Sequence, residues 1–158
     1  MNKWYNFYNF EASFKKFLIA ENLSPVTLKN YLSDLRHFLG WSILKLKSKN
    51  EKINLENINY LDFLEKINEP IIEEYKNYLI INSIPLKTIN RRLSTIRKFF
   101  SFCISQGWLN QNPAKKIKNE NFNKEEILKS FQEDLKKENL DQNTIKSYLI
   151  TIREFLNL

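Results

Sequence analysis

Apolar side chains recur at helical spacing in three separate stretches of the chain. Over residues 24–41 the leucines follow one another at steps of four, three and four, at Leu28, Leu32, Leu35 and Leu39. This spacing is typical of an amphipathic α-helix. Ser24 is a suitable N-cap and Pro25 fits the first helical turn, while Gly40 is a candidate for the helix end. The pattern therefore predicts a helix that begins at Pro25 and stops near Gly40.

Residues 85–108 repeat this design. Their apolar seam consists of Ile89, Leu93, Ile96, Phe100 and Cys103. Gly107 follows the seam, and a glycine at that place can adopt the left-handed conformation that closes a helix. A constant offset of 61 residues relates the two stretches and matches Thr27, Leu32, Arg36 and Phe38 to Thr88, Leu93, Arg97 and Phe99.

A third copy lies near the carboxyl end. Residues 131–156 align with residues 14–39 without a gap and share 12 identities in 26 positions, more than chance readily produces. Another helical stretch precedes each copy, at residues 11–21, 69–82 and 123–138, so the chain reads as three helical hairpins. Asn68 and Asn123 are the expected N-caps of the last two stretches.

The junctions between the hairpins carry the signs of loops. Residues 42–67 contain a run of polar residues and then a short helical stretch around residues 60–67. Residues 109–122 include Asn112-Pro113, which favours a turn. We expect one domain over residues 1–118 and an additional helical hairpin over residues 119–158.

Composition supports an all-α protein. Two glycines and four prolines among 158 residues leave little material for the turns of a many-stranded sheet, and 42% hydrophobic residues can form a packed core. Cys103 is the single cysteine, which excludes an intramolecular disulfide, and its apolar neighbours suggest burial. With no long apolar run and no signal-peptide pattern, we expect a cytoplasmic protein.

The positive charge is concentrated in one part of the chain. The formal net charge is +7, and residues 71–118 carry nine Lys and Arg against two Asp and Glu. Within this block the polar positions Lys87, Arg91, Ser94 and Lys98 recur along one helical face, opposite the apolar seam. Cationic side chains on one stripe suit phosphates, so the block favours nucleic acid over an acidic membrane or an acidic protein.

The two helical patterns resemble a known family. The pattern S-P-x-T-L-x-x-Y-x-x-D-L-x-x-F begins at Ser24, and T-I-x-R-x-L-S-x-I-R-x-F-F begins at Thr88 and is followed by Gly107-Trp108 and Asn112-Pro113. In this order and spacing they resemble the amino-terminal core-binding domain (SAM-like) of phage-integrase and Xer-type tyrosine recombinases. Residues 11–118 carry the resemblance.

The resemblance implies a fold and a function. It implies a bundle of two crossed helical hairpins, which forms half of a clamp around duplex DNA and acts in DNA integration or recombination. The helices that begin at Pro25 and Leu86 would face the DNA. The expected DNA-binding residues on them are Ser24, Thr27, Lys29, Asn30, Lys87, Thr88, Asn90, Arg91, Ser94 and Lys98.

Several of the polar and charged residues on these helices also have a structural interpretation. A charged stripe opposite an apolar seam is ordinary on a surface helix, and Ser24 and Thr27 can be capping residues only. Arg36, Arg97 and Arg153 share one repeat position, and Arg153 lies in the acidic third hairpin. That arginine position is therefore as readily structural as functional.

We expect no catalysis by this chain. A complete tyrosine recombinase needs a separate catalytic domain with an arginine pair, a lysine, a histidine motif and a nucleophilic tyrosine. The single histidine, His37, lacks that context and is expected at a solvent-facing or boundary position, and Tyr31 and Tyr148 occupy equivalent, core-facing repeat positions. One cysteine and one histidine do not make a metal site, and no cofactor motif is present.

Two alternatives stay open for the third hairpin and for the function. The hairpin is either the start of a second core-binding unit in a longer recombinase, or it packs on its own domain or on a second chain. Packing on a second chain would give a homo-oligomer or a domain-swapped dimer through residues 123–158.

The rival function is a helical adaptor whose repeated hairpins and basic stripe bind an acidic protein.

Overall fold

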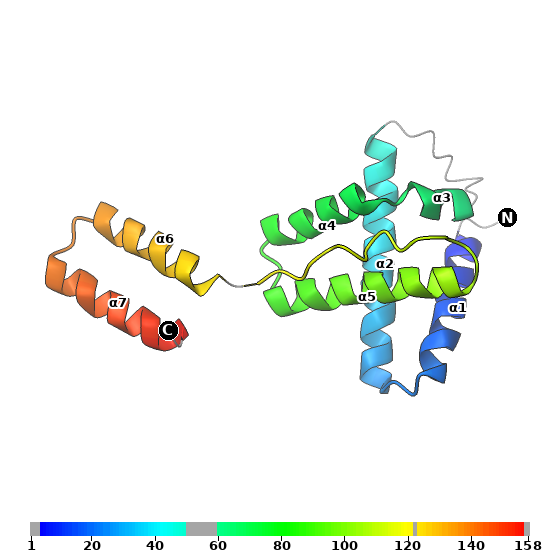
Figure 1. Cartoon of the computed structure of the whole chain (residues 1–158), viewed down its shortest axis with the longest axis horizontal. Coiled ribbons are helices and arrows are strands. Elements are labelled where there is room, and N and C mark those ends of the chain that lie inside the picture. Colours follow the sequence, from blue (N-terminus) through cyan, green and yellow to red (C-terminus); the bar gives the residue numbers. More distant parts are fainter. Residues whose placement is uncertain (1–3, 50–59, 122, 157–158) are drawn as a thin grey trace. The chain divides into compact units, whose positions relative to one another are not determined.

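A computed structural model describes residues 4–49, 60–121 and 123–156 of the chain, with side chains from Phe10 onward in the first helix (Figure 1). The regular elements of these residues are all α-helices, which confirms the all-α prediction. They are α1 (Trp4–Ala20), α2 (Pro25–Ser48), α3 (Tyr60–Lys66), α4 (Glu69–Ile81), α5 (Leu86–Ser105), α6 (Lys124–Lys137) and α7 (Gln142–Leu156). The chain divides into two compact units, Met1–Asn119 and Glu120–Leu158.

Polar side chains cap the helices where the sequence places them. The Ser24 hydroxyl accepts a hydrogen bond from the backbone N–H of Thr27 at 3.2 Å. The side chain of Asn68 accepts from the N–H of Ile71 at 3.1 Å, and Asn123 caps α6 in the same way. Each cap pairs a backbone donor that has no partner inside the helix.

The three hairpin turns share one backbone feature. Asn22, Ser83 and Asn139 have positive φ angles of 55°, 54° and 53°. They occupy the same repeat position, at offsets of 61 and 117 residues. A left-handed residue just after a helix lets the following N–H groups reach the last carbonyls of the helix, as in the 3.0 Å bond from the Ile84 N–H to the Leu79 carbonyl. The sequence repeat is therefore also a repeat of turn geometry.

Two helix ends differ from the prediction. Helix α2 does not stop at Gly40 but runs to Ser48, because the residues after the glycine still pack on the core: Ser42 is 0% and Leu46 2% exposed. A glycine inside a helix costs about 1 kcal/mol relative to alanine, which this packing offsets. Helix α1 begins at Trp4, before the expected residue 11. Gly107, by contrast, has the expected left-handed conformation at φ 71°.

Within Met1–Asn119 two hairpins lie across each other. Helices α1 and α2 form one antiparallel hairpin, and α4 and α5 form a second that lies across it (Figure 1). The most extensive helix contact of this unit is between α2 and α5. The unit therefore has the crossed-hairpin arrangement that the family resemblance implied.

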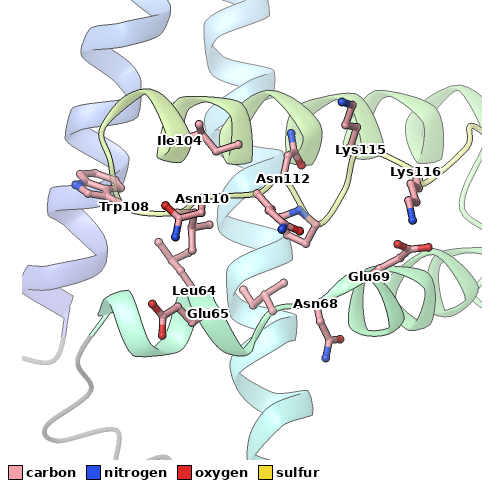
Figure 2. A pocket seen from close by; sticks show the side chains of 14 residues that line it. Leu64, Glu65, Asn68, Glu69, Ile104, Trp108, Asn110, Asn112, Lys115 and Lys116 are labelled. Atoms are coloured by element: carbon pink, nitrogen blue, oxygen red, sulfur yellow. The ribbon is translucent and has the colours of Figure 1, made fainter.

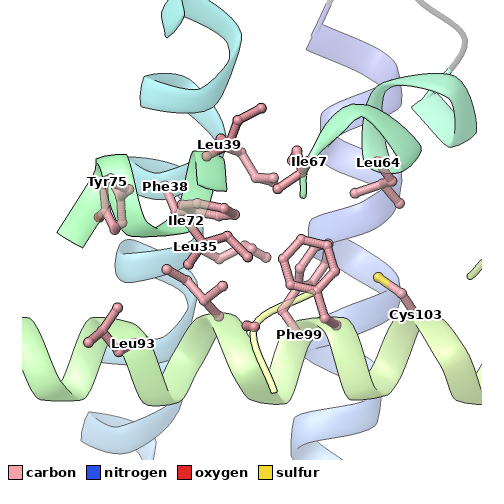
Figure 3. Packing of buried hydrophobic residues seen from close by; sticks show 14 of the residues in the cluster. Leu35, Phe38, Leu39, Leu64, Ile67, Ile72, Tyr75, Leu93, Phe99 and Cys103 are labelled. Atoms are coloured by element: carbon pink, nitrogen blue, oxygen red, sulfur yellow. The ribbon is translucent and has the colours of Figure 1, made fainter. Parts of the chain in front are cut away.

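The core lies where these hairpins cross (Figure 3). Phe38 of α2 is fully buried, with its ring centroid 5.1 Å from that of Tyr75 on α4 and 6.2 Å from that of Phe100 on α5. Cys103 is also fully buried, and burial raises the pKa of its thiol to about 12. It is a small apolar core residue, as its neighbours in the sequence suggested.

Residues 106–119 return along α5 toward its amino-terminal end (Figure 1). Arg97 of α5 holds this segment by donating to the Ile117 carbonyl at 2.8 Å and to the Asn119 side chain at 2.7 Å. Asn112 donates back to the Arg97 carbonyl at 3.0 Å. Arg97 therefore has a structural role, and the repeat-equivalent Arg36 pairs with α1, where its Nε donates to Glu11 at 2.8 Å.

The second unit consists of α6 and α7. The side chains buried between these two helices are Leu128, Leu135 and Ile145. Tyr148 is 48% exposed, so the prediction that it faces a core as Tyr31 does is wrong for this unit. The physical reason is that, among the described residues of this unit, no helix besides α6 is present to cover the flank of α7 on which Tyr148 lies.

Candidate nucleic-acid interface

An ion pair between a buried carboxylate and a partly exposed guanidinium joins α2 to α5 where they cross. Asp34 of α2 is 2% exposed, as buried as the apolar residues Leu35 and Phe38 that follow it on the same helix. Arg91 of α5 donates to both of its carboxylate oxygens, from Nε and from a terminal nitrogen, each at 2.9 Å. This two-point contact raises the pKa of Arg91 and holds the guanidinium in one orientation.

A second arginine approaches the same carboxylate. The Nε of Arg92 lies 3.7 Å from Asp34, and one of its terminal nitrogens lies 3.4 Å from the ring nitrogens of His37. Thr95 contributes a hydroxyl 3.4 Å from the carboxylate. One negative charge thus faces two positive charges, so the crossing keeps a local excess of positive charge.

His37 links this cluster to α4. Its Nδ1 lies 2.7 Å from the hydroxyl oxygen of Tyr75, and the imidazole is half-buried. Burial lowers the pKa of His37, and the positive charge of Arg92 lowers it further. The neutral imidazole is therefore the form that this site favours. The position matches the boundary location expected from the sequence.

The predicted residues of α2 fall into two groups. Ser24 and Thr27 bond to each other through their hydroxyl oxygens at 2.8 Å, in addition to the cap described above. Their side chains are thus used in starting the helix. Lys29 is exposed and Asn30 half-buried, and both lie little more than one helical turn before Asp34.

The predicted stripe on α5 is partly occupied by internal bonds. Lys98 forms an ion pair with Glu21 at 2.5 Å, and its ammonium lies 5.7 Å from the centre of the Phe17 ring. Ser94 accepts a hydrogen bond from Arg97 at 3.1 Å. The carboxyl-terminal end of the stripe, at Ser94 and Lys98, is therefore less available to a phosphate than the sequence suggested.

The amino-terminal end of the stripe is more open. Lys87 is exposed, Thr88 and Asn90 are half-buried, and Arg91 retains 45% of its side-chain exposure. Within the described residues, Lys29 and Lys87 take part in none of the ion pairs found. Lys29 and Lys87 thus lie in the amino-terminal halves of α2 and α5, each little more than one turn before the member of the Asp34–Arg91 pair on its own helix.

Asp34, Arg92 and His37 were not expected at the site. One signal in the sequence pointed to Asp34: it is a charged residue between apolar positions of α2, three residues after Tyr31 and next to Leu35. A charge at such a position has to be paired when it is buried. The partner is not visible in the sequence, because it comes from a helix 57 residues away.

A separate groove lies beside the start of α4. Its volume is about 760 Å³, and its walls come from the α3–α4 junction and the returning segment (Figure 2). Lys116 and Glu69 point toward each other at one end of it (Figure 2). The groove contains none of the residues predicted to bind DNA.

Two further findings concern other kinds of site. Among the residues that the structure describes, no group of three His, Cys, Asp or Glu side chains is placed to hold a metal ion. No described helix combines the length and apolar character that crossing a membrane requires.

Comparison with known proteins gives consistent matches for the first unit. Residues 12–107 match the family described as phage integrase, N-terminal SAM-like domain. The chain is 30% identical over 109 residues to tyrosine recombinase XerD of Rickettsia bellii, a match that covers 68% of this chain and 31% of the relative.

A second relative matches over a similar stretch. The chain is 31% identical over 98 residues to tyrosine recombinase XerC of Staphylococcus haemolyticus, covering 60% of the chain and 27% of that protein. The matched stretch is thus less than a third of each relative's length. No solved structure matches the chain.

Proposed function

The chain belongs to the phage integrase N-terminal SAM-like domain family, and from this premise we propose that it is a non-catalytic module that binds duplex DNA in integration or site-specific recombination. The single observation that carries the proposal is the distribution of charge. The unit that matches the family holds the basic block of residues 71–118, whereas residues 119–158 carry six basic against eight acidic residues.

The crossing of α2 and α5 supports a mode of binding. Arg91 uses two of its five N–H donors on Asp34, which leaves donors on an exposed and oriented guanidinium for a phosphate oxygen. Lys29 and Lys87 lie on the two helices and supply further positive charge. Such contacts position a protein on the duplex and carry no base specificity of their own.

Asp34 has a positioning role in this mode. By holding Arg91 it reduces the side-chain entropy that DNA binding would otherwise cost. It also offsets the repulsion between Arg91 and Arg92, which follow each other on α5. Asn30, Thr88 and Asn90 lie within four residues of Asp34 or Arg91 along their helices, and we infer that these polar side chains contact sugars or base edges.

Fluorescence anisotropy with a labelled duplex tests the proposal. We expect binding at low salt, and with four to six phosphate contacts a slope of about −4 to −5 in a plot of log K against log salt. K29Q with K87Q should weaken binding, whereas K129Q with K146Q, which removes two exposed lysines of the second unit, should not. Absence of duplex binding at low salt would overturn the proposal.

The strength of duplex binding and its dependence on salt separate DNA binding from the adaptor function. An acidic protein partner would also need Lys29 and Lys87, but it would leave duplex affinity weak and nearly independent of salt. Self-association through residues 123–158 is a further proposal, and it does not require DNA.

A further inference from the structure

The first unit shows how hairpins of this repeat cover each other. Helices α2 and α5 are repeat copies, related by the offset of 61 residues, and they pack against each other. Leu35 of α2 and its repeat equivalent Ile96 of α5 are both buried in the single core cluster of this unit, as are Phe38 and Phe99. One copy of the repeat therefore serves as the cover for another copy.

The described residues of Glu120–Leu158 provide no such cover for the third copy. Phe155 of α7 is the repeat equivalent of Phe38, at the offset of 117 residues. Phe38 is 0% exposed, whereas Phe155 is 79% exposed. Tyr148 lies on the same flank of α7, two turns before Phe155, and is half exposed. The two aromatic side chains form an apolar face, called here the α7 face, together with Ile152 between them.

The polar groups around this face differ from those of the first unit. Asp34 of α2 pairs with Arg91 of α5, so the α2–α5 contact joins unlike charges. The α7 residue equivalent to Asp34 is Thr151, and the one equivalent to Arg91 is Ser147. Both are small and neutral. A face of this kind can meet an identical face without placing like charges opposite each other.

We propose that two copies of the chain pair through their α7 faces, with the two α7 helices crossing as α2 and α5 do. Phe155 of each copy is then buried against the other, and Thr151 of one copy lies opposite Ser147 of its partner. The inference rests on the proposed self-association and specifies its surface. It does not depend on DNA binding, which uses residues of the other unit.

The charges on α5 disfavour a domain swap as the way in which the α7 face is covered. In a swap, α7 would take the place of α2 on the α4–α5 hairpin of a second copy. Thr151 would then replace Asp34 and leave Arg91 and the mostly buried Arg92 without a carboxylate. An uncompensated buried charge is strongly destabilising, so the swapped arrangement fits the charges less well than the pairing of two α7 faces.

Sedimentation equilibrium of the full chain over a range of concentrations tests the pairing. We expect a monomer–dimer equilibrium, and F155D should weaken dimerisation at least about tenfold, because the symmetry buries two charges at once. The matched control is I150D, which changes another exposed apolar residue of α7, 59% exposed, on the opposite flank. Circular dichroism verifies that both variants remain helical.

Disulfide formation between two cysteine variants tests the crossing itself. A mixture of T151C and S147C chains should form an intermolecular disulfide on oxidation, and Cys103 does not interfere because it is fully buried. A wild-type chain that stays monomeric, an equal effect of I150D and F155D, or a dimer that forms no such disulfide would each overturn the proposal. Duplex binding by a monomeric chain would show that only the pairing had failed.

Discussion

The first and third hairpins are nearly the same sequence in two different surroundings. They share 12 of 26 residues, the same left-handed turn position and the same order of apolar residues. In the first hairpin Phe38 is closed in by Tyr75 and Phe100. In the third, the equivalent Phe155 faces outward. Local sequence thus determines the hairpin, whereas the burial of its apolar face depends on the helices that pack against it.

The two hairpins also differ in the polar residues that border their apolar faces. Where a basic helix crosses, the repeat has Asp34 and His37, which pair with side chains of α5 and α4. Where no such helix is present within the unit, the same positions hold Thr151 and Glu154. The difference indicates that Asp34 and His37 belong to the contact between hairpins and not to the hairpin itself.

The largest effect should come from removing the two equivalent phenylalanines. F38A should lower the free energy of unfolding by about 3–5 kcal/mol, because it leaves a cavity in a packed core. F155A should change the stability of the monomer by less than about 0.5 kcal/mol, as for an exposed residue. Denaturant unfolding followed by circular dichroism at low protein concentration measures both. Equal losses would mean that the two faces are covered alike.

A smaller effect should follow from neutralising the carboxylate at the crossing. D34N leaves Arg91 and Arg92 without their counter-charge and should cost about 2–4 kcal/mol, toward the lower end of the range for buried pairs because Arg91 keeps 45% exposure. The matched change T151V in the third hairpin should be nearly neutral. A D34N chain as stable as wild type would show that the pair is dispensable for folding.

The smallest effect should be a pH dependence specific to the first hairpin. The folded-state pKa of His37 lies below its ordinary value of 6.5, so the unfolded chain binds the proton more readily. This contribution to stability is fully present above 6.5 and is lost as the pH falls toward the folded-state pKa. H37Q should therefore lose less stability on acidification than wild type does. Identical profiles for the two chains would contradict the assignment.

Features that depend on neighbouring residues were predictable from the sequence. The caps at Ser24, Asn68 and Asn123 and the turn at Gly107 follow from short-range hydrogen bonding and backbone preference. Gly40 misled the prediction because the intrinsic preference of one residue was outweighed by tertiary packing of the residues after it.

Features that depend on distant helices were not predictable. The sequence predicted which face of α5 is apolar and which is polar. It does not show that Lys98 pairs with Glu21 or that Ser94 bonds to Arg97. The partner of Asp34 depends on the angle at which two hairpins cross. The exposure of Tyr148 likewise depends on the absence of a crossing helix in its unit, although its repeat equivalent Tyr31 packs against a core.

The salt dependence of duplex binding tests the central claim most directly, because it counts the phosphate contacts that each unit makes. Removing Lys29 and Lys87 together should make the slope of log K against log salt less steep by about 2. Removing Lys129 and Lys146 from the second unit should leave the slope unchanged. A slope that responds equally to both pairs, or to neither, would contradict the assignment of DNA binding to the crossing of α2 and α5.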